Sequence, residues 1–218
     1  MANNPNPTLS SLLLLLSILY MSGTVAPAFV RPPVPRLRSR SHSRTYIEAS
    51  CATTRYPSLC IQYLSTFSNT TIRTPQDLAE AALYASLCRA KSTKSFMWKV
   101  LKDAKAVKGR EYQLIKDCLD QLNDGVEQIG QSIAELRRLA GKEEAAGGGA
   151  IWHISNVETW TSAALTNANN CVDAFPGKRM SKLKATIKGK VLNVAQSTSN
   201  ALALFHQYAA RYKAATKP

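Results

Sequence analysis

Residues 112–140 read YQLIKDCLDQLNDGVEQIGQSIAELRRLA, and this stretch decides the fold class. Its apolar positions recur at alternating intervals of three and four residues, so they fall on one stripe of an α-helix. These positions are Tyr112, Ile115, Leu119, Leu122, Val126, Ile129, Ile133, Leu136 and Ala140. A stripe with this period is typical of the seam of a left-handed helical bundle. The stretch therefore predicts a helix that packs against other helices.

A second amphipathic helix is predicted before this stretch, from Thr74 to about Gly109. Thr74 is a good N-cap residue, Pro75 suits the first turn, and Asp77 places negative charge near the helix N-terminus. The expected apolar face consists of Leu78, Ala82, Ala85, Cys88, Phe96, Val100 and Ala104.

Two more helices are predicted after the glycine-rich link at residues 145–149. One runs from about Ile154 to Phe175 and stops at Pro176-Gly177, and the last begins near Ser181. Their expected apolar faces are Val157, Trp160, Ala164, Ala168, Cys171 and Phe175, and then Leu183, Ile187, Val191, Val194, Thr198, Ala201, Phe205, Tyr208 and Tyr212. Strand signals are few, so the chain is predicted to be all-α, an up-down-up-down four-helix bundle.

A shorter helical unit precedes the bundle. Residues 45–68 contain two short helical patterns that meet at Tyr56-Pro57, where the proline interrupts a helix. Cys51 and Cys60 lie on either side of this break, so they can face each other across a helical hairpin. We expect a local disulfide there.

Several pieces of this sequence together resemble the plant invertase and pectin methylesterase inhibitor family. They are Cys51 and Cys60 with eight residues between them, Cys118, the run WTSAALTNANNC at residues 160–171, and the run SNALAL at residues 199–204. The resemblance covers about residues 45–212. It implies a four-helix bundle with an N-terminal helical hairpin, and we assign residues 45–213 to such an inhibitor domain.

The resemblance also implies the disulfide pairing, Cys51 with Cys60 and Cys118 with Cys171. The apolar pattern supports the second pair, since Cys118 adjoins the seam and Cys171 lies on the expected inner face of its helix. Each disulfide contributes about 2–4 kcal/mol. Cys88 departs from the family arrangement, and we expect a free thiol, buried like a small apolar side chain. An intermolecular disulfide is the alternative.

The family contains inhibitors of two enzymes. Many invertase inhibitors carry Pro-Lys-Phe before the third bundle helix, whereas residues 141–149 read GKEEAAGGG here, and the WTSAAL run looks closer to the methylesterase group. The resemblance therefore implies a secreted, non-enzymatic inhibitor of pectin methylesterase. Inhibition of invertase is the alternative, and a pectin-binding wall protein without inhibitory activity is an alternative of another class.

An acidic stripe on the helix at 112–140 is the candidate partner surface. Asp117, Asp120, Asp124 and Glu127 recur at helical spacing away from the apolar seam, and like charges so spaced destabilise a helix by a few tenths of a kcal/mol per pair. Either a partner compensates this charge or the stripe is an ordinary solvated face. The resemblance implies that bundle helices cover the pectin-binding cleft of the esterase without a covalent bond. The matching positions are Asp120, Asp124, Glu127, Asn170 and Asp173, with Asn170 where the family usually has threonine.

The first 44 residues are not expected to belong to the bundle. The apolar run at 9–21 is too short to span a bilayer comfortably and, with Ala26 and Ala28 after it, predicts a signal peptide at residues 1–28 that is cleaved after Ala28. A retained anchor is the alternative, because no basic residue precedes the run. Residues 29–44 read FVRPPVPRLRSRSHSR and predict a disordered, basic Pro/Ser-rich arm, either a solvated linker or a tether to pectin.

The net charge and the predicted export limit which other partners are expected. The net charge is +14, and removing the five arginines of residues 29–44 leaves +9 on residues 45–218. A basic surface favours polyanions, and acidic pectin is the polyanion of the apoplast. The predicted export and the lack of a nucleic-acid-binding motif argue against nucleic acid as a partner. We also expect no contact with a membrane after the signal peptide is cleaved. Asn69-Thr70-Thr71 is the only standard glycosylation sequon, so we expect a glycan on Asn69.

Catalysis is not predicted. His42, His153 and His206 lie far apart in the sequence, and there is no phosphate-binding glycine loop and no metal-ligand spacing. We therefore expect no catalytic residue, no cofactor and no metal.

Overall fold

The computed structural model describes residues 36–67, 72–103, 107–139, 149–175 and 180–215. The chain divides into two units at Arg36, and the description concerns the unit that begins at Leu37. The expected signal peptide at 1–28 and the sequon at Asn69 lie outside the described residues. Among these residues no helix is both long and apolar enough to cross a membrane.

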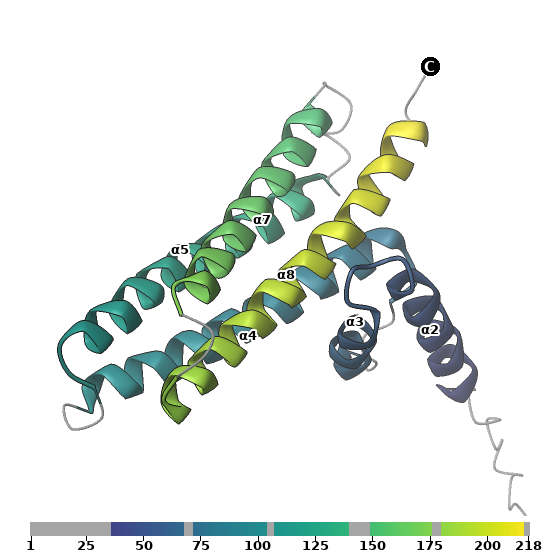
Figure 1. Ribbon diagram of the computed structural model, residues 1–218. Coiled ribbons are helices and arrows are strands. Elements are labelled where there is room, and N and C mark those ends of the chain that lie inside the picture. The colour runs from purple at the N-terminus through teal and green to yellow at the C-terminus, as the bar shows by residue number, and fades with distance from the viewer. Residues whose placement is uncertain (1–35, 68–71, 104–106, 140–148, 176–179, 216–218) are drawn as a thin grey trace, which may run out of the picture. The chain divides into compact units, whose positions relative to one another are not determined.

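Four long helices form the bundle, namely α4 (Pro75–Lys102), α5 (Arg110–Leu139), α7 (Gly149–Asp173) and α8 (Lys182–Ala215). Helix α4 packs against α5 and α8, and α7 packs against the same two helices, so the four close into a ring around one core (Figure 1). Every regular element in the described part of the chain is a helix. The predicted all-α, up-down-up-down bundle is confirmed.

Local sequence signals predict some helix ends correctly and others incorrectly. The hydroxyl of Thr74 accepts a hydrogen bond from the backbone N–H of Asp77 at 3.0 Å, and the Asp77 carboxylate accepts one from the backbone N–H of Thr74 at 2.9 Å. This capping box begins α4 where it was predicted. The predicted end at Gly109 is wrong, because α4 stops at Lys102, and Gly109 takes a φ of 58° directly before α5. Helix α7 begins at Gly149, earlier than predicted, because the side chain of Ala150 already packs into the core.

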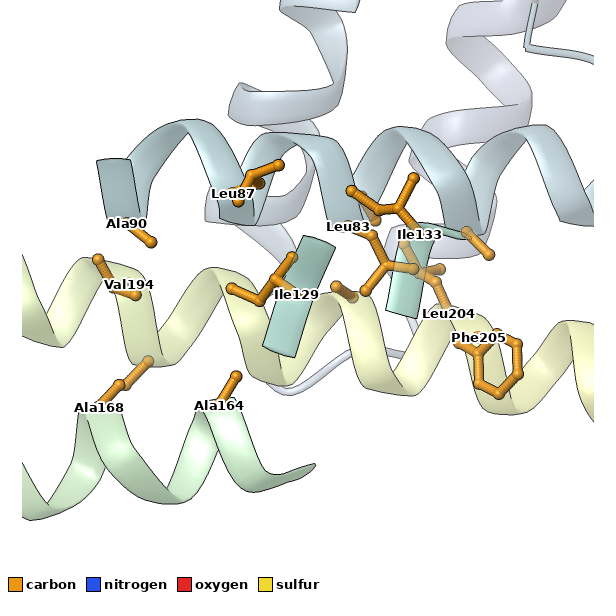
Figure 2. Packing of buried hydrophobic residues seen from close by; sticks show 14 of the residues in the cluster. Leu83, Leu87, Ala90, Ile129, Ile133, Ala164, Ala168, Val194, Leu204 and Phe205 are labelled. Atoms are coloured by element: carbon orange, nitrogen blue, oxygen red, sulfur yellow. The ribbon is translucent and has the colours of Figure 1, made fainter. Parts of the chain in front are cut away.

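The core is built from the inward stripes of all four helices. Figure 2 shows Leu83 and Leu87 of α4 beside Ile129 and Ile133 of α5, with side chains of α7 and α8 closing the other side. Helix α7 contributes the small residues Ala164 and Ala168. Gly125 of α5 packs against Ala164, where an added Cβ would lie 3.8 Å from the carbonyl oxygen. Small side chains at this contact let α5 and α7 approach closely.

The N-terminal hairpin consists of α2 (Arg36–Cys51) and α3 (Pro57–Leu64), followed by the 3-10 turn η1 (Ser65–Phe67). A disulfide joins Cys51 to Cys60, whose Cα atoms lie 5.7 Å apart. Both cysteines are buried, so the bridge is part of the packed core. The predicted helical hairpin with its local disulfide is confirmed.

The predicted disordered arm at 29–44 needs correction, because α2 already begins at Arg36. The last proline of the arm is Pro35, and arginine is a good helix former. A tertiary contact adds to this, because Ser43 is buried and donates a hydrogen bond to the carbonyl oxygen of Ile72 at 3.2 Å. Within α2, Arg44 pairs with Glu48 one turn later. The second half of the arm is therefore helix.

Asn200 of α8 ties the hairpin to the bundle. Its side chain is only 3% exposed and binds both backbone groups of Tyr56, the residue before Pro57. The Asn200 Oδ1 accepts from the Tyr56 N–H at 3.1 Å, and Nδ2 donates to the Tyr56 carbonyl oxygen at 2.9 Å. A second, exposed hydrogen bond runs from Gln207 of α8 to the Thr53 hydroxyl at 2.7 Å. One buried amide thus fixes the turn of the hairpin.

We expect Asn200→Ala to lower the free energy of unfolding by about 1–3 kcal/mol. The Tyr56 N–H loses the Asn200 acceptor, and the Tyr56 carbonyl oxygen keeps only its hydrogen bond from the Cys60 N–H. Urea unfolding followed by circular dichroism measures this loss. Gln207→Ala is the matched control on the same helix, and because its hydrogen bond is exposed it should cost about 0.5 kcal/mol or less. Equal and small losses in the two variants would show that the Asn200 amide does not hold the hairpin.

Candidate protein-binding face on helices α5 and α7

A second disulfide brings the two groups of predicted partner residues together. It joins Cys118 of α5 to Cys171 of α7, and their Cα atoms lie 4.9 Å apart. Both cysteines are buried, and helices α5 and α7 run antiparallel to each other (Figure 1). Asp120 lies two residues after Cys118, and Asn170 and Asp173 lie within two residues of Cys171. Side chains that are far apart in the sequence therefore gather around one bridge.

Helix geometry places these side chains on one exposed face. In two antiparallel helices that face each other through a disulfide, the position before each cysteine turns to the same side of the pair. These positions are Asp117 and Asn170, and Asp124 follows Asp117 at helical spacing. The more outward positions on each helix are also exposed. We call the whole set the carboxylate face, and its members are Asp117, Asp120, Asp124, Glu127, Asn170 and Asp173.

The carboxylate face carries negative charge on a basic protein. Asp117 accepts a hydrogen bond from Gln113 of the same helix at 2.7 Å. Among the described residues, no ion pair neutralises Asp120, Asp124 or Glu127. The chain as a whole carries a net charge of +14, so this face is a local reversal of sign. Such a face attracts a partner with basic or polar groups.

Moving along the two helices away from the disulfide, a series of polar contacts holds α5 and α7 in register. Asn167 donates to the side-chain oxygen of Gln128 at 3.1 Å. Further along, the Thr161 hydroxyl donates to the Ser132 hydroxyl at 3.0 Å, and both residues are buried. Because a buried polar group without a partner is costly, these contacts oppose sliding of one helix along the other. They keep the spacing of the carboxylate face constant.

The last contact in this series involves a buried carboxylate. Glu135 of α5 is 8% exposed and accepts hydrogen bonds from His153 Nδ1 at 2.6 Å and from Asn156 Nδ2 at 3.3 Å, both on α7. Arg138 of α5 forms an ion pair with it. Burial raises the pKa of Glu135, but the hydrogen bonds from His153 and Asn156 and the positive charge of Arg138 outweigh burial, so the pKa lies below its ordinary value. Glu135 is therefore an ionised link between the two helices.

The chemistry of the face is that of binding. Its side chains are carboxylates and one amide on rigid helices, and within the described ranges no group of three or more side chains could hold a metal ion. His153 lies beside Glu135 in the helix contact, and His206 lies on α8 at 3.8 Å from Glu158. His153 and His206 thus take part in separate helix contacts.

Two features were wrong or missing in the sequence-based prediction. Cys88 is unpaired, but it is exposed on α4 rather than buried. The preceding residue, Leu87, occupies the core position, so Cys88 points about 100° away from it around the helix.

The Glu135–His153 pair was not predicted, because its partners lie on different helices. Its only sequence signal is a glutamate directly before the seam residue Leu136.

Comparisons with known proteins concern the family and the fold of the chain. Residues 45–204 match the protein family described as plant invertase/pectin methylesterase inhibitor. Pectinesterase inhibitor 9 of Arabidopsis thaliana is 47% identical over 174 residues, which cover 78% of this chain and 84% of that protein. Pectinesterase inhibitor 11 of Arabidopsis thaliana is 40% identical, with 77% and 82% covered. A crystal structure of a mutant form of a pectin methylesterase inhibitor from Arabidopsis shares the fold, with a TM-score of 0.57, 18% identity, and 72% of this chain and 92% of that chain covered.

The lowered pKa of Glu135 predicts a pH-dependent contribution to stability. A carboxyl group whose pKa is lower in the folded state stabilises the protein above its unfolded pKa, and this stabilisation is lost as the pH falls through the folded pKa. Glu135→Gln should therefore lower the free energy of unfolding by about 1–3 kcal/mol near neutral pH. The deficit should shrink below about pH 4, where the unfolded carboxyl group takes up its proton.

Urea unfolding of the wild type and the variant over a pH series measures this dependence. Glu127→Gln, an exposed carboxylate of the same helix, is the control and should show little change at any pH. A deficit for Glu135→Gln that stays constant across the series would contradict an ionised Glu135 as the link between α5 and α7.

Proposed function

The chain belongs to the plant invertase/pectin methylesterase inhibitor family, and from this premise we propose that it inhibits a pectin methylesterase by binding it. Two relatives that are 47% and 40% identical carry the name pectinesterase inhibitor, and the aligned regions cover more than four fifths of each. As a member of an inhibitor family, the chain is not an enzyme.

The observation that supports the binding mode is the carboxylate face itself. The Cys118–Cys171 disulfide holds acidic side chains of α5 and α7 on one exposed side, and Asp120, Asp124 and Glu127 lack an ion-pair partner among the described residues. A cleft that binds acidic pectin must offer basic or polar groups to carboxylates. In our proposal the carboxylates of the inhibitor occupy those groups and exclude the polysaccharide. The inhibition is reversible, since no covalent step is involved.

Rigidity makes such a face effective. Two proteins that associate lose side-chain and backbone freedom, and a surface that is already ordered loses less. Here the disulfide, the Asn167–Gln128 contact and the Glu135 cluster order both helices before any partner arrives. We infer that the bundle binds as a rigid body, so that the loss of conformational freedom offsets little of the favourable interaction energy.

The place of action in this proposal is the cell wall. The apolar run at 9–21 followed by Ala26 and Ala28 supports export with cleavage after Ala28. Two buried disulfides are in keeping with an oxidising compartment. We therefore propose that the mature protein, with its inhibitor domain at residues 45–213, is secreted to the apoplast.

Invertase is the second candidate target, because the family description names both enzymes. The absence of Pro-Lys-Phe from residues 141–149 favours the esterase. Titration of the purified mature protein against a pectin methylesterase and an invertase, from acidic to neutral pH, decides between them. If both enzymes keep full activity at saturating protein, the proposed function is rejected.

The double variant Asp120→Lys/Asp124→Lys tests the carboxylate face. We expect the inhibition constant for pectin methylesterase to rise by about 10- to 100-fold, because two attractive contacts become repulsive. The wild type should also inhibit less strongly as salt concentration increases. Esterase assays at several salt concentrations measure both effects, and circular dichroism checks that the helix content is unchanged.

A matched control changes the same amount of charge elsewhere. Glu48→Lys/Glu158→Lys reverses two acidic side chains on α2 and α7 that lie outside the carboxylate face. These side chains pair with Arg44 and His206, so circular dichroism checks that this variant also keeps its helix content. This control should inhibit nearly as well as the wild type. If both double variants inhibit normally, the carboxylate face has no part in binding, and if both fail equally, only the net charge matters.

A further inference from the structure

The outer side of α4 combines aromatic rings with lysines. Tyr84, Lys91, Trp98 and Lys102 are all exposed, and their spacing of seven, seven and four residues places them on one stripe of the helix. The two aromatic residues remain 44% and 50% exposed. We call this set the α4 stripe. It lies on the opposite side of α4 from the buried residues Ala82, Ser86 and Thr93.

Positive charge is concentrated in the second half of α4. The segment 91–102 reads KSTKSFMWKVLK, with four lysines and no acidic residue. Lys99 and Lys102 lie in the last turn, where the helix dipole favours cations. That effect does not reach Lys91 and Lys94, two turns earlier. The start of α5 lies at the same end of the bundle (Figure 1). Its first two turns include the exposed residues Tyr112 and Lys116.

Lysine ammonium groups are placed directly over aromatic rings here. The Lys102 Nζ lies 3.6 Å from the centre of the Trp98 ring, and on the other flank the Lys190 Nζ of α8 lies 4.9 Å from the centre of the Phe96 ring. Each pair joins an apolar ring and a positive charge in one small area. Because Trp98 is half exposed, the Trp98–Lys102 pair is open to a ligand from solvent.

A uronic acid has the complementary chemistry. One side of its sugar ring presents C–H groups that pack on an aromatic ring, and its carboxylate pairs with an ammonium group. A polymer with one carboxylate on each ring can repeat these contacts along Trp98, Lys102 and Lys91. Phosphate polymers are the competing ligand class, because a lysine ammonium group pairs with phosphate as well as with carboxylate. A comparison of polygalacturonate with RNA distinguishes the two classes.

We propose that the α4 stripe binds an acidic polysaccharide, namely de-esterified pectin. The choice of pectin rests on the proposed function, whereas the binding site rests on the residues of α4. The stripe and the carboxylate face lie on different helices and carry opposite charge. De-esterified pectin is the product that a pectin methylesterase leaves behind, so binding to it would raise the local concentration of the inhibitor where the enzyme has acted.

Isothermal titration of the purified mature protein with polygalacturonate tests the site. Highly methyl-esterified pectin, with the same sugar backbone and few free carboxylates, is the control ligand. We expect binding to polygalacturonate that weakens as salt concentration rises, and little binding to the esterified polymer. Equal binding of the two polymers, or tighter binding of a single-stranded RNA of similar charge, would overturn the proposal.

Variants separate stacking from charge. Trp98→Ala should weaken polygalacturonate binding by about two- to tenfold without changing the charge. Lys91→Gln/Lys102→Gln should weaken it by about two- to thirtyfold. Lys182→Gln/Arg211→Gln removes the same charge from exposed positions of α8 and should change it by less than about twofold. Equal effects of the two charge variants, or no effect of Trp98→Ala, would refute a site on α4.

Esterase inhibition measured on the same variants distinguishes this inference from the proposed function. Residues 29–44 stay in every variant, so their arginines contribute an equal background. We expect the α4 variants to inhibit like the wild type, with unchanged circular dichroism. If an α4 variant that keeps its fold loses inhibition, α4 belongs to the esterase interface and the separate site is rejected. If the wild type binds polygalacturonate but inhibits no esterase, the proposed function fails and the α4 site remains.

Discussion

The contact between α5 and α7 is the constraint on which the functional surface depends. The Cys118–Cys171 disulfide fixes one point of this contact, and Gly125 against Ala164 lets the helices approach closely further along. Two antiparallel rods joined at one point can still rotate or slide. The Thr161–Ser132 hydrogen bond and the Glu135 cluster prevent this, because displacement would leave buried polar groups without partners. The positions of the exposed carboxylates follow from this arrangement.

The same combination of a covalent bridge and a buried polar contact recurs at the hairpin. Cys51–Cys60 closes the hairpin on itself, and the Asn200 amide attaches its turn to α8. A two-helix hairpin of this size has too little apolar surface to be stable alone. It therefore depends on the bundle for its stability, and one buried side chain supplies a specific anchor.

The described surface has regions of opposite charge, which the net charge of the whole chain does not reveal. The overall value of +14 indicates a basic protein, yet α5 and α7 carry an acidic face while the second half of α4 carries lysines and exposed rings. A protein that binds an enzyme of pectin meets both the enzyme and its polyanionic substrate. In our proposals the enzyme meets the carboxylate face and the polyanion meets the α4 stripe, and the separation of the two charges limits repulsion of each partner by the other surface.

The sequence by itself determined the four bundle helices, most of their inward positions and the family, although Tyr112 and Cys88 of the predicted stripes are exposed. The spacing of residues 112–140 and the Thr74–Asp77 capping box are local properties, because a helix repeats every 3.6 residues whatever surrounds it. Only the tertiary structure decided which residues of different helices meet. Glu135 and His153, or Tyr56 and Asn200, are brought together by the rotation of each helix about its own axis, and packing of the whole core sets that rotation. The same reason explains the errors: Cys88 lies one position beyond the core stripe of α4, and α2 extends to Arg36 through contacts such as Ser43 with Ile72 that no local pattern contains.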